Sequence, residues 1–316
     1  MRARSRLMTG LGAATAALLL ITGCSATPQD NGGGDADALT VYATTGYLAD
    51  AVANIAPDAD VTTMVGPGGD PHTYQPSTRD IETIQNADVV LWNGLHLEAQ
   101  MIDQLESLGD KQLAIGDALP EDLLLAWPET DDEGNPLHDP HVWNSPEAWS
   151  LVVGYVADKL GEIDPENADE YQANAEAYIG EIEAAAAEAE ELLASVPEPR
   201  ILITGHDAFN YFGDTYDLEV YATDFVSTEA ALSAEELSEL AMLIADNQVP
   251  VIFQDNQANP QAITSLREAV RALGWEVEIS DQELYADSLG ADPGVDTYLG
   301  VFTHNAQAVA DALGTE

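Results

Sequence analysis

Residues 165–196 read PENADEYQANAEAYIGEIEAAAAEAEELLASV, and this stretch decides how the rest of the chain is arranged. It is rich in Ala and Glu, which are strong helix formers, and Gly180 is the only helix breaker between Pro165 and Pro197. At 1.5 Å per residue, about thirty residues make a helix roughly 45 Å long, which crosses a whole domain. The alternative is a coiled-coil arm, but no sustained heptad is present. We therefore predict a rigid connecting helix over 165–197.

The chain before this helix alternates short apolar runs with helical patterns. The apolar runs predict strands at 39–43, 61–65 and 87–92. Helices are expected at 47–55, 78–86 and 146–163. Alternation of this kind is typical of βαβ units and a parallel sheet. We predict an N-terminal α/β lobe over 38–164.

The chain after the helix repeats the α/β pattern. Strands are expected at 200–204, 218–221, 250–253 and 276–279, and helices at 233–247, 259–273 and 295–313. Ser233 and Glu236 form a capping-box pattern at the start of one of these helices. We predict a C-terminal α/β lobe over 198–316. The predicted fold class is therefore α/β, with two lobes that each hold a small, mainly parallel sheet and are joined by one long spine helix.

The N-terminus is typical of an export signal. Three arginines precede an apolar stretch over 7–21 that is too short for a comfortable membrane span and ends at small residues before Cys24. Small residues followed by a cysteine resemble a bacterial lipobox, which implies a signal peptide over 1–23 and lipid on Cys24. The alternative is a plain secretory signal, or an uncleaved anchor, with an incidental cysteine. Residues 24–37 carry that cysteine and a Gly-rich, polar tether.

Composition narrows the classes of partner and site. Cys24 is the sole cysteine, which excludes an internal disulfide and a cysteine-based metal site. Nine Lys and Arg residues stand against 57 Asp and Glu residues, and Arg2, Arg4 and Arg6 belong to the signal. The mature chain therefore keeps six basic residues, and its surface should repel nucleic acid and anionic lipid headgroups. The acidity indicates solubility and does not by itself argue for a specific metal site.

Three of the six histidines and one aspartate lie in short, distinctive contexts. The contexts are Asp70-Pro71-His72-Thr73-Tyr74, Asp139-Pro140-His141-Val142-Trp143, Thr204-Gly205-His206-Asp207 and Tyr285-Ala286-Asp287-Ser288. Three imidazoles and a carboxylate make a ligand set for a borderline divalent ion, zinc first. We predict one metal site made by His72, His141, His206 and Asp287. With the export signal, this site indicates an extracytoplasmic protein that captures metal.

The expected secondary structure places these ligands at comparable positions. His72 lies in a loop after the second expected strand, and His206 directly follows the strand at 200–204. Asp287 lies in the loop beyond 276–279, and ligands of open α/β sheets collect at the carboxyl ends of strands. Two of the four candidate ligands fall in each half of the chain, so we expect the metal in a cleft between the lobes. Asp70 and Asp139 could orient the two imidazoles that follow them, or could simply form turns.

These motifs resemble those of the solute-binding lipoproteins of zinc and manganese ABC importers, the TroA-like family. The resemblance covers essentially the whole mature chain. It includes the turn at 93–98 (NGLHLE) and the segments LYADSL at 284–289 and DTYL at 296–299. It implies two α/β lobes joined by a long helix, metal in the cleft, and delivery to a membrane permease driven by a separate ATPase. Asp255 matches a position where the family usually has Glu, and it could help hold the cleft.

Two departures from the family bear on the cargo. Zinc-dedicated relatives often carry a His-rich acidic loop before the second ligand, whereas residues 129–134 here are acidic with only His138 nearby. Manganese-leaning relatives often have Glu at the third ligand position, which is His206 here. Neutral imidazoles favour Zn²⁺ as bound cargo, but a bidentate Asp287 would also permit Mn²⁺.

The leading prediction is a monomeric, lipid-anchored binding protein at the outer side of the cell membrane, with no enzymatic activity. A metal-dependent surface adhesin is one alternative. A secreted zinc hydrolase is another, although catalytic zinc usually keeps three protein ligands and a water, and no HExxH motif is present. Among the other histidines, His96 could line the cleft and His138 could assist metal acquisition, but a structural hydrogen bond and a solvated loop are the simpler readings. His304 is expected at the surface.

Overall fold

The structure, a computed structural model, describes residues 38–130, 134–224, 232–257 and 259–314. The predicted signal peptide (1–23), the tether (24–37) with its Cys24, and the centre of the acidic loop at 129–134 lie outside these ranges. No helix in the described ranges combines the length and apolarity that a membrane crossing requires. The residues from Ala38 onward pack as one unit, and the predicted lobe boundaries at 164 and 197 remain predictions.

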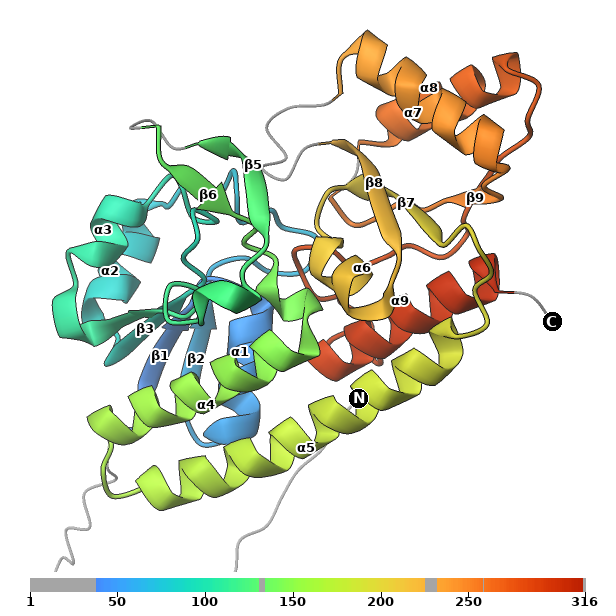
Figure 1. Cartoon of the computed structure of the whole chain (residues 1–316). Coiled ribbons are helices and arrows are strands. Elements are labelled where there is room, and N and C mark those ends of the chain that lie inside the picture. Colours follow the sequence, from blue (N-terminus) through green and yellow to red (C-terminus); the bar gives the residue numbers. More distant parts are fainter. Residues whose placement is uncertain (1–37, 131–133, 225–231, 258, 315–316) are drawn as a thin grey trace, which may run out of the picture. The chain divides into compact units, whose positions relative to one another are not determined.

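The first part of the described chain builds a four-stranded parallel sheet (Figure 1). Its strands are β1 (Thr40–Ala43), β2 (Asp60–Thr63), β3 (Val89–Trp92) and β4 (Gln112–Ala114), in the order β2-β1-β3-β4. Val41 of β1 lies opposite Val61 on one side and Val89 on the other. All four residues of β3 are buried, as its unbroken apolar run predicts for a central parallel strand. The three-residue edge strand β4 was not predicted.

Helices follow the strands as expected. The helix α1 (Gly46–Ile55) begins after Thr45, whose side chain caps it, and buries Leu48, Val52 and Ile55. The helix α2 (Thr78–Asn86) begins with a capping box between Ser77 and Asp80. The short helix α3 (Ile102–Glu106), which was not predicted, precedes β4.

An unpredicted antiparallel hairpin follows this sheet in the chain and precedes the long helices. Its strands are β5 (Ala126–Thr130) and β6 (Pro136–His138). A short 3-10 turn, η3 (Val142–Asn144), then leads into α4 (Pro146–Ile163), which matches its predicted range. The hairpin and the turn bring the second Asp-Pro-His segment beside the sheet.

The predicted connecting helix is confirmed as α5 (Ala168–Leu193). It is shorter than the predicted range of 165–197: the helix begins after Asn167 and ends before Ala194. Its 26 residues span about 39 Å. It packs along α4 and α1 from the first part of the chain and along α9 (Tyr298–Leu313) from the last part (Figure 1). One helix therefore supports both regions.

The last part of the chain contains two short parallel ladders. They pair β7 (Ile201–His206) with β8 (Glu219–Asp224), and β9 (Val251–Ile252) with β10 (Glu278–Ile279). The N–H of Phe253 donates to the carbonyl of Ile203, which joins β9 to β7. The helices are α6 (Asn210–Tyr216), α7 (Ala234–Asn247), α8 (Pro260–Ala272) and α9. The predicted α/β class with parallel sheets is therefore confirmed, and only the short α6 was missed among these helices.

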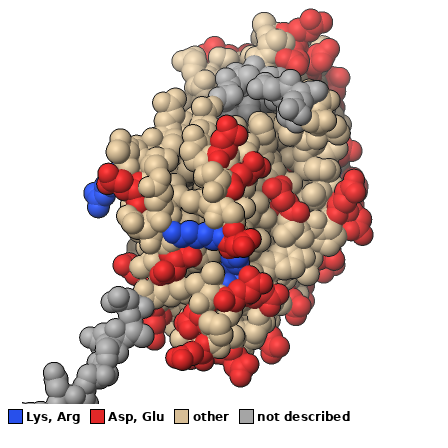
Figure 2. Space-filling view, turned by 90° about the vertical axis from the view of Figure 1, so that its left-hand side faces the viewer, with Lys and Arg blue, Asp and Glu red and all other residues tan. Residues whose placement is uncertain are grey.

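The surface carries the acidity of the sequence. On the face drawn in Figure 2, Asp and Glu side chains are numerous at the centre, along the right-hand edge and at the bottom, and Lys and Arg side chains are few. Such a surface has the same sign of charge as nucleic acid and anionic lipid headgroups.

Candidate metal centre

A tight turn presents His72. The N–H of Gly69 donates to the carbonyl of Gly66, Pro67 occupies the second position, and Gly68 has a φ of 72°. These are the features of a type II turn, which needs a residue with positive φ at its third position. A Cβ at residue 69 would lie 2.6 Å from a Val65 methyl carbon, so glycine is also required there. The chain reverses direction at this turn, and the His72 side chain that follows is buried.

The other three ligand candidates come from well separated segments. His141 lies between β6 and η3, and His206 is the last residue of β7 rather than the residue after it. Asp287 lies in the loop between β10 and α9. The carboxyl ends of β2 and β7 thus supply two ligands directly or through one loop, as the strand-end rule predicts.

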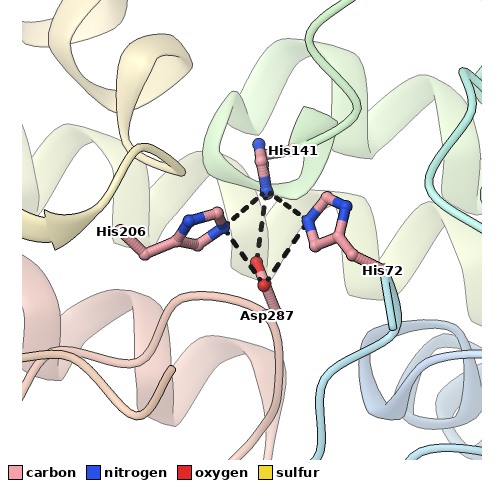
Figure 3. A group of neighbouring side chains, drawn as sticks. All are labelled: His72, His141, His206 and Asp287. Atoms are coloured by element: carbon pink, nitrogen blue, oxygen red, sulfur yellow. Dashed lines mark hydrogen bonds and ion pairs between the residues drawn. The ribbon is translucent and has the colours of Figure 1, made fainter. Parts of the chain in front are cut away.

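The structure brings all four side chains together (Figure 3). The Nε2 atom of His141 is 3.2 Å from Nε2 of His72 and 3.2 Å from Nε2 of His206. Oδ2 of Asp287 is 3.2 Å from Nε2 of His206 and 3.6 Å from Nε2 of His72. Oδ1 of Asp287 is 3.3 Å from Nε2 of His141. The four side chains form a closed cluster of three nitrogen atoms around one carboxylate.

The spacing of these donor atoms fits a metal ion. A tetrahedral shell with ligand distances of 2.0–2.1 Å has edges of about 3.3 Å between donors. The five donor distances given above, 3.2 to 3.6 Å, are close to this value. Both carboxylate oxygens of Asp287 are buried, and they face the Nε2 atoms of the three histidines. A cation at the centre would satisfy these oxygens, which are costly to bury alone.

Burial makes the site a closed one. His72 is 4% exposed, and His141, His206 and Asp287 are 0% exposed. A bound ion would therefore be enclosed by protein. Four protein ligands with both carboxylate oxygens turned inward differ from a catalytic zinc site, which keeps one position for water.

Burial and neighbouring charges shift the pKa values of the three imidazoles in different directions. Burial lowers the pKa of His72 to about 3, despite the attraction of Asp287. Burial also disfavours the charged form of His141, but attraction and hydrogen bonding by Asp139 and then Asp287 raise its pKa to about 10. The pKa of His206 is raised as well, because Asp287 outweighs burial. The pKa of Asp287 lies well below its usual value, because His206 and His141 outweigh its burial. The cluster without metal therefore holds protons beside an ionised carboxylate.

Asp139 fixes the ring of His141. Its Oδ1 is 2.6 Å from Nδ1 of His141 and accepts the backbone N–H of the same residue at 2.9 Å, while its Oδ2 accepts from the Asn210 amide. A ring that donates from Nδ1 presents the Nε2 lone pair to a metal. An orienting role for Asp139 requires contacts of this kind, and the role itself stays a prediction.

Asp70 acts on the backbone of its segment. Its Oδ1 accepts the N–H of His72 at 2.8 Å, and its Oδ2 accepts the hydroxyl of Thr73 at 2.9 Å. This arrangement is that of a turn-forming aspartate, the other alternative for this residue. Asp255, in contrast, is buried, and its Oδ2 accepts the backbone N–H of His206 at 2.7 Å. This bond connects Asp255 to the end of β7.

The loop that carries Asp287 is held by residues that the sequence did not single out. The Tyr47 hydroxyl and the Trp143 indole N–H both donate to the carbonyl of Ala286 at 2.9 Å. The Asn256 amide oxygen accepts the N–H of Ala286, and the Gln257 amide oxygen accepts the N–H of Asp287. Polar loop residues of this kind have no local pattern, because their partners are distant in the chain.

The turn at 93–98 is hydrogen-bonded to the segment that carries His141. The Asn93 amide donates to the carbonyl of Pro140 at 2.9 Å. The buried Glu98 carboxylate accepts the backbone N–H groups of Asn93 and Gly94 and the Thr44 hydroxyl, and burial raises its pKa to about 7. Hydrogen bonds through this turn therefore connect the end of β3 to the segment that carries His141.

The remaining described histidines lie outside the cluster. His96 is in the turn at 93–98, where its ring lies 6.4 Å from that of Trp127. His138 ends β6, and Nε2 of His304 lies 2.8 Å from the carbonyl of Glu283. Within the described ranges, the group of His72, His141, His206 and Asp287 is the one with metal-ligand spacing.

Comparison with known proteins gives a consistent result. The family described as ZnuA, zinc-uptake complex component A, periplasmic, matches residues 41–312. The manganese-binding lipoprotein MntA of Bacillus subtilis (strain 168) is 34% identical over 98% of this chain and 99% of its own length. The iron-binding protein YfeA of Yersinia pestis is 30% identical over 92% of this chain and 91% of its own.

One relative is similar in both sequence and structure. The zinc-binding protein TroA of Treponema pallidum (strain Nichols) is 36% identical over 86% of this chain and 88% of its own. A solved structure of TroA superposes with a TM-score of 0.82 and covers 88% of this chain and 100% of that one. The chain therefore belongs to the ZnuA/TroA family of extracytoplasmic, metal-binding solute-binding proteins of ABC importers, which are transport receptors and not enzymes.

Proposed function

We propose that this protein captures Zn²⁺ outside the cell membrane and hands it to the permease of an ABC importer, with Mn²⁺ as the alternative cargo. The observation that carries the proposal is the enclosed cluster of three Nε2 atoms and one carboxylate, with edges of 3.2 to 3.6 Å. Neutral imidazole nitrogen in a four-ligand, near-tetrahedral set suits zinc. The ligand roles of His72, His141, His206 and Asp287 are part of this proposal.

The names of the relatives do not indicate which metal this protein binds. The three compared above carry names that refer to manganese, zinc and iron. Both oxygens of Asp287 face the imidazoles, which leaves room for a bidentate carboxylate and a five-coordinate ion. Zinc exceeds manganese and ferrous iron in intrinsic affinity for a given site, so tight zinc binding is expected whichever metal the cell delivers.

The proposal includes attachment and partners. Lipid on Cys24 would anchor the mature chain to the membrane, and the residues at 24–37 would act as the tether. The partners are then a permease and its ATPase, and the protein acts as a monomer. Replacement of Cys24 by Ala should move the protein from the membrane fraction to the soluble extracytoplasmic fraction; retention in the membrane fraction would contradict lipidation.

Calorimetric titration of the metal-free protein tests the cargo. The chain starting after Cys24 is stripped of metal and titrated separately with Zn²⁺ and Mn²⁺. The proposal expects one tightly bound zinc ion per chain, and a matched Asp287→Asn variant of nearly the same shape should bind it much more weakly. Tight binding of manganese with weaker zinc would overturn the preference for zinc. Binding of neither metal would overturn the four-ligand site.

A further inference from the structure

Two loops that carry ligands are tied together by hydrogen bonds that do not involve the metal. The turn at 66–69 precedes His72, and Ser288 directly follows Asp287. The hydroxyl oxygen of Ser288 accepts the N–H of Gly68 at 2.9 Å. The two segments are 220 residues apart in the chain, so this bond joins the early ligand to the late one.

Gln257 makes a second connection between the same loops. Its Oε1 accepts the N–H of Asp287 at 3.2 Å, and its Nε2 donates to the carbonyl of Gly69 at 2.8 Å. The partners have opposite polarity, so they fix the orientation of the amide. A primary amide can accept from one backbone group through its oxygen and donate to another through its nitrogen, and Gln257 does both.

We propose that Gln257 and Ser288 form a latch between the His72 loop and the Asp287 loop, and that this latch slows release of the bound ion. An ion enclosed by four buried side chains leaves only when ligands separate. The latch opposes separation of His72 from Asp287 through the backbone of their loops, without contacting a ligand atom. Gln257 and Ser288 are thus positioning residues for metal retention. The inference rests on the proposed function of metal capture and release.

Asn256 supports the latch from the neighbouring position. Its amide nitrogen donates to the carbonyl and the hydroxyl oxygen of Ser288, both at 2.8 Å, and its amide oxygen accepts the N–H of Ala286. These bonds fix the Asp287 loop onto the segment after β9. The latch therefore connects the His72 turn to a loop that is already held in place.

Release kinetics of the loaded protein test the latch. Protein loaded with Zn²⁺, or separately with Mn²⁺, is mixed with excess chromogenic chelator, and the first-order release rate is measured. Gln257→Glu keeps an acceptor for Asp287 but places an oxygen against the Gly69 carbonyl. It should speed release about ten-fold, and Ser288→Ala about three-fold, as expected for lost hydrogen bonds of modest strength. Association rates should stay unchanged, because the ligands are intact.

The matched control is Gln261→Glu, which adds the same charge in the exposed first turn of α8. Its release rate should equal that of the wild type. Because the latch does not touch the metal, the acceleration by Gln257→Glu should be similar for both ions. The double variant should release less quickly than the product of the single effects, since both bonds hold the same pair of loops.

Three outcomes would overturn the latch. The first is unchanged release in both variants, and the second is an equal acceleration in Gln261→Glu. The third is an effect on association alone. If the wild type bound neither ion, the proposed function would fail together with the latch, whereas a wild type that binds and variants that release normally would remove the latch only.

Discussion

The two Asp-Pro-His segments have the same three residues and use them differently. In the segment of His141, the Asp139 carboxylate accepts from the ring and from the backbone of the histidine. In the segment of His72, the described bonds of the Asp70 carboxylate go to backbone and hydroxyl groups of the turn. One aspartate orients a side chain, and the other shapes a loop.

The difference follows from depth and neighbours. Asp139 is 1% exposed, and Asn210 satisfies its second oxygen, so its charge acts on His141 in a poorly solvated place. Asp70 is half-buried beside the turn at 66–69. The pKa of His141 is accordingly raised to about 10, while burial lowers that of His72 to about 3. A short motif thus specifies where an imidazole can be placed, and the packing around it specifies how that imidazole is held.

Removal of the imidazoles should have the largest effect. We expect His72→Ala and His141→Ala each to weaken zinc binding by more than about 100-fold, since loss of a ligand should exceed the 10- to 100-fold cost of losing a group that orients one. Competition with a chelator of known affinity measures this. A variant that binds zinc as tightly as the wild type would show that its histidine is not a ligand.

Replacement of the two aspartates tests the comparison directly. Asp139→Asn should weaken metal binding by about 10- to 100-fold, because the carboxylate that orients His141 is lost. Asp70→Asn should change it by less than about three-fold, since Asn forms the same kind of turn. Both affinities are measured by the same chelator competition. Equal losses in the two variants would mean that the aspartates have the same role.

Metal binding should depend on pH through the proton held by His141. A raised histidine pKa means that the empty site is protonated at pH 7, so an ion must displace a proton. Zinc affinity should therefore rise about ten-fold per pH unit for each proton released, between pH 6 and 8. Titrations in buffers of different ionisation enthalpy count the protons. Affinity independent of pH would contradict a protonated His141.

The proton held by His141 should also stabilise the folded state of the metal-free protein. The raised pKa contributes stability that is fully present below the unfolded histidine pKa of about 6.5. This contribution is lost as pH rises through about 10. Asp139→Asn should reduce this dependence, whereas Asp70→Asn should leave it as it is. Thermal unfolding of the metal-free variants between pH 6.5 and 10 makes the measurement.

The smallest expected effect comes from a change remote from both segments. Gly180 lies inside α5, and a Cβ there would meet no atom within 4 Å. Gly180→Ala should raise the free energy of unfolding by about 0.5–1 kcal/mol through lower backbone entropy in the unfolded chain. Denaturant unfolding of the metal-free protein measures it. A shift in metal affinity would show that α5 is coupled to the two segments.

The sequence predicted the parts whose signal is local. The range of α4 and the burial of β3 follow from helix signals and from an unbroken apolar run. The edge strand β4 was missed, because its apolar run, Leu113 to Ile115, is short and follows the polar Gln112. The hairpin of β5 and β6 was missed as well, since Pro128 and an acidic loop obscure any alternation.

The candidate site divides in the same way. The four candidate ligands, which the structure brings together, could be identified because each lies in a short motif at a predicted element end. Gln257 and Ser288 were not found, because the bonds that matter connect positions 188 and 220 residues apart. Such pairings depend on how segments far apart in the chain meet in the fold. Local sequence therefore locates the candidate ligands but cannot locate the residues that hold their loops together.

The contact between Trp143 and His141 has a practical consequence. The buried indole lies edge-on to the imidazole, with ring centroids 5.3 Å apart, and its N–H is fixed on the carbonyl of Ala286. Exchange of the imidazole proton for an ion changes the electric field at this indole. The tryptophan emission of the unlabelled protein should thus follow occupancy of the site, and Trp143→Phe should abolish that optical signal. Trp143 is therefore an intrinsic fluorescence probe of metal binding at His141.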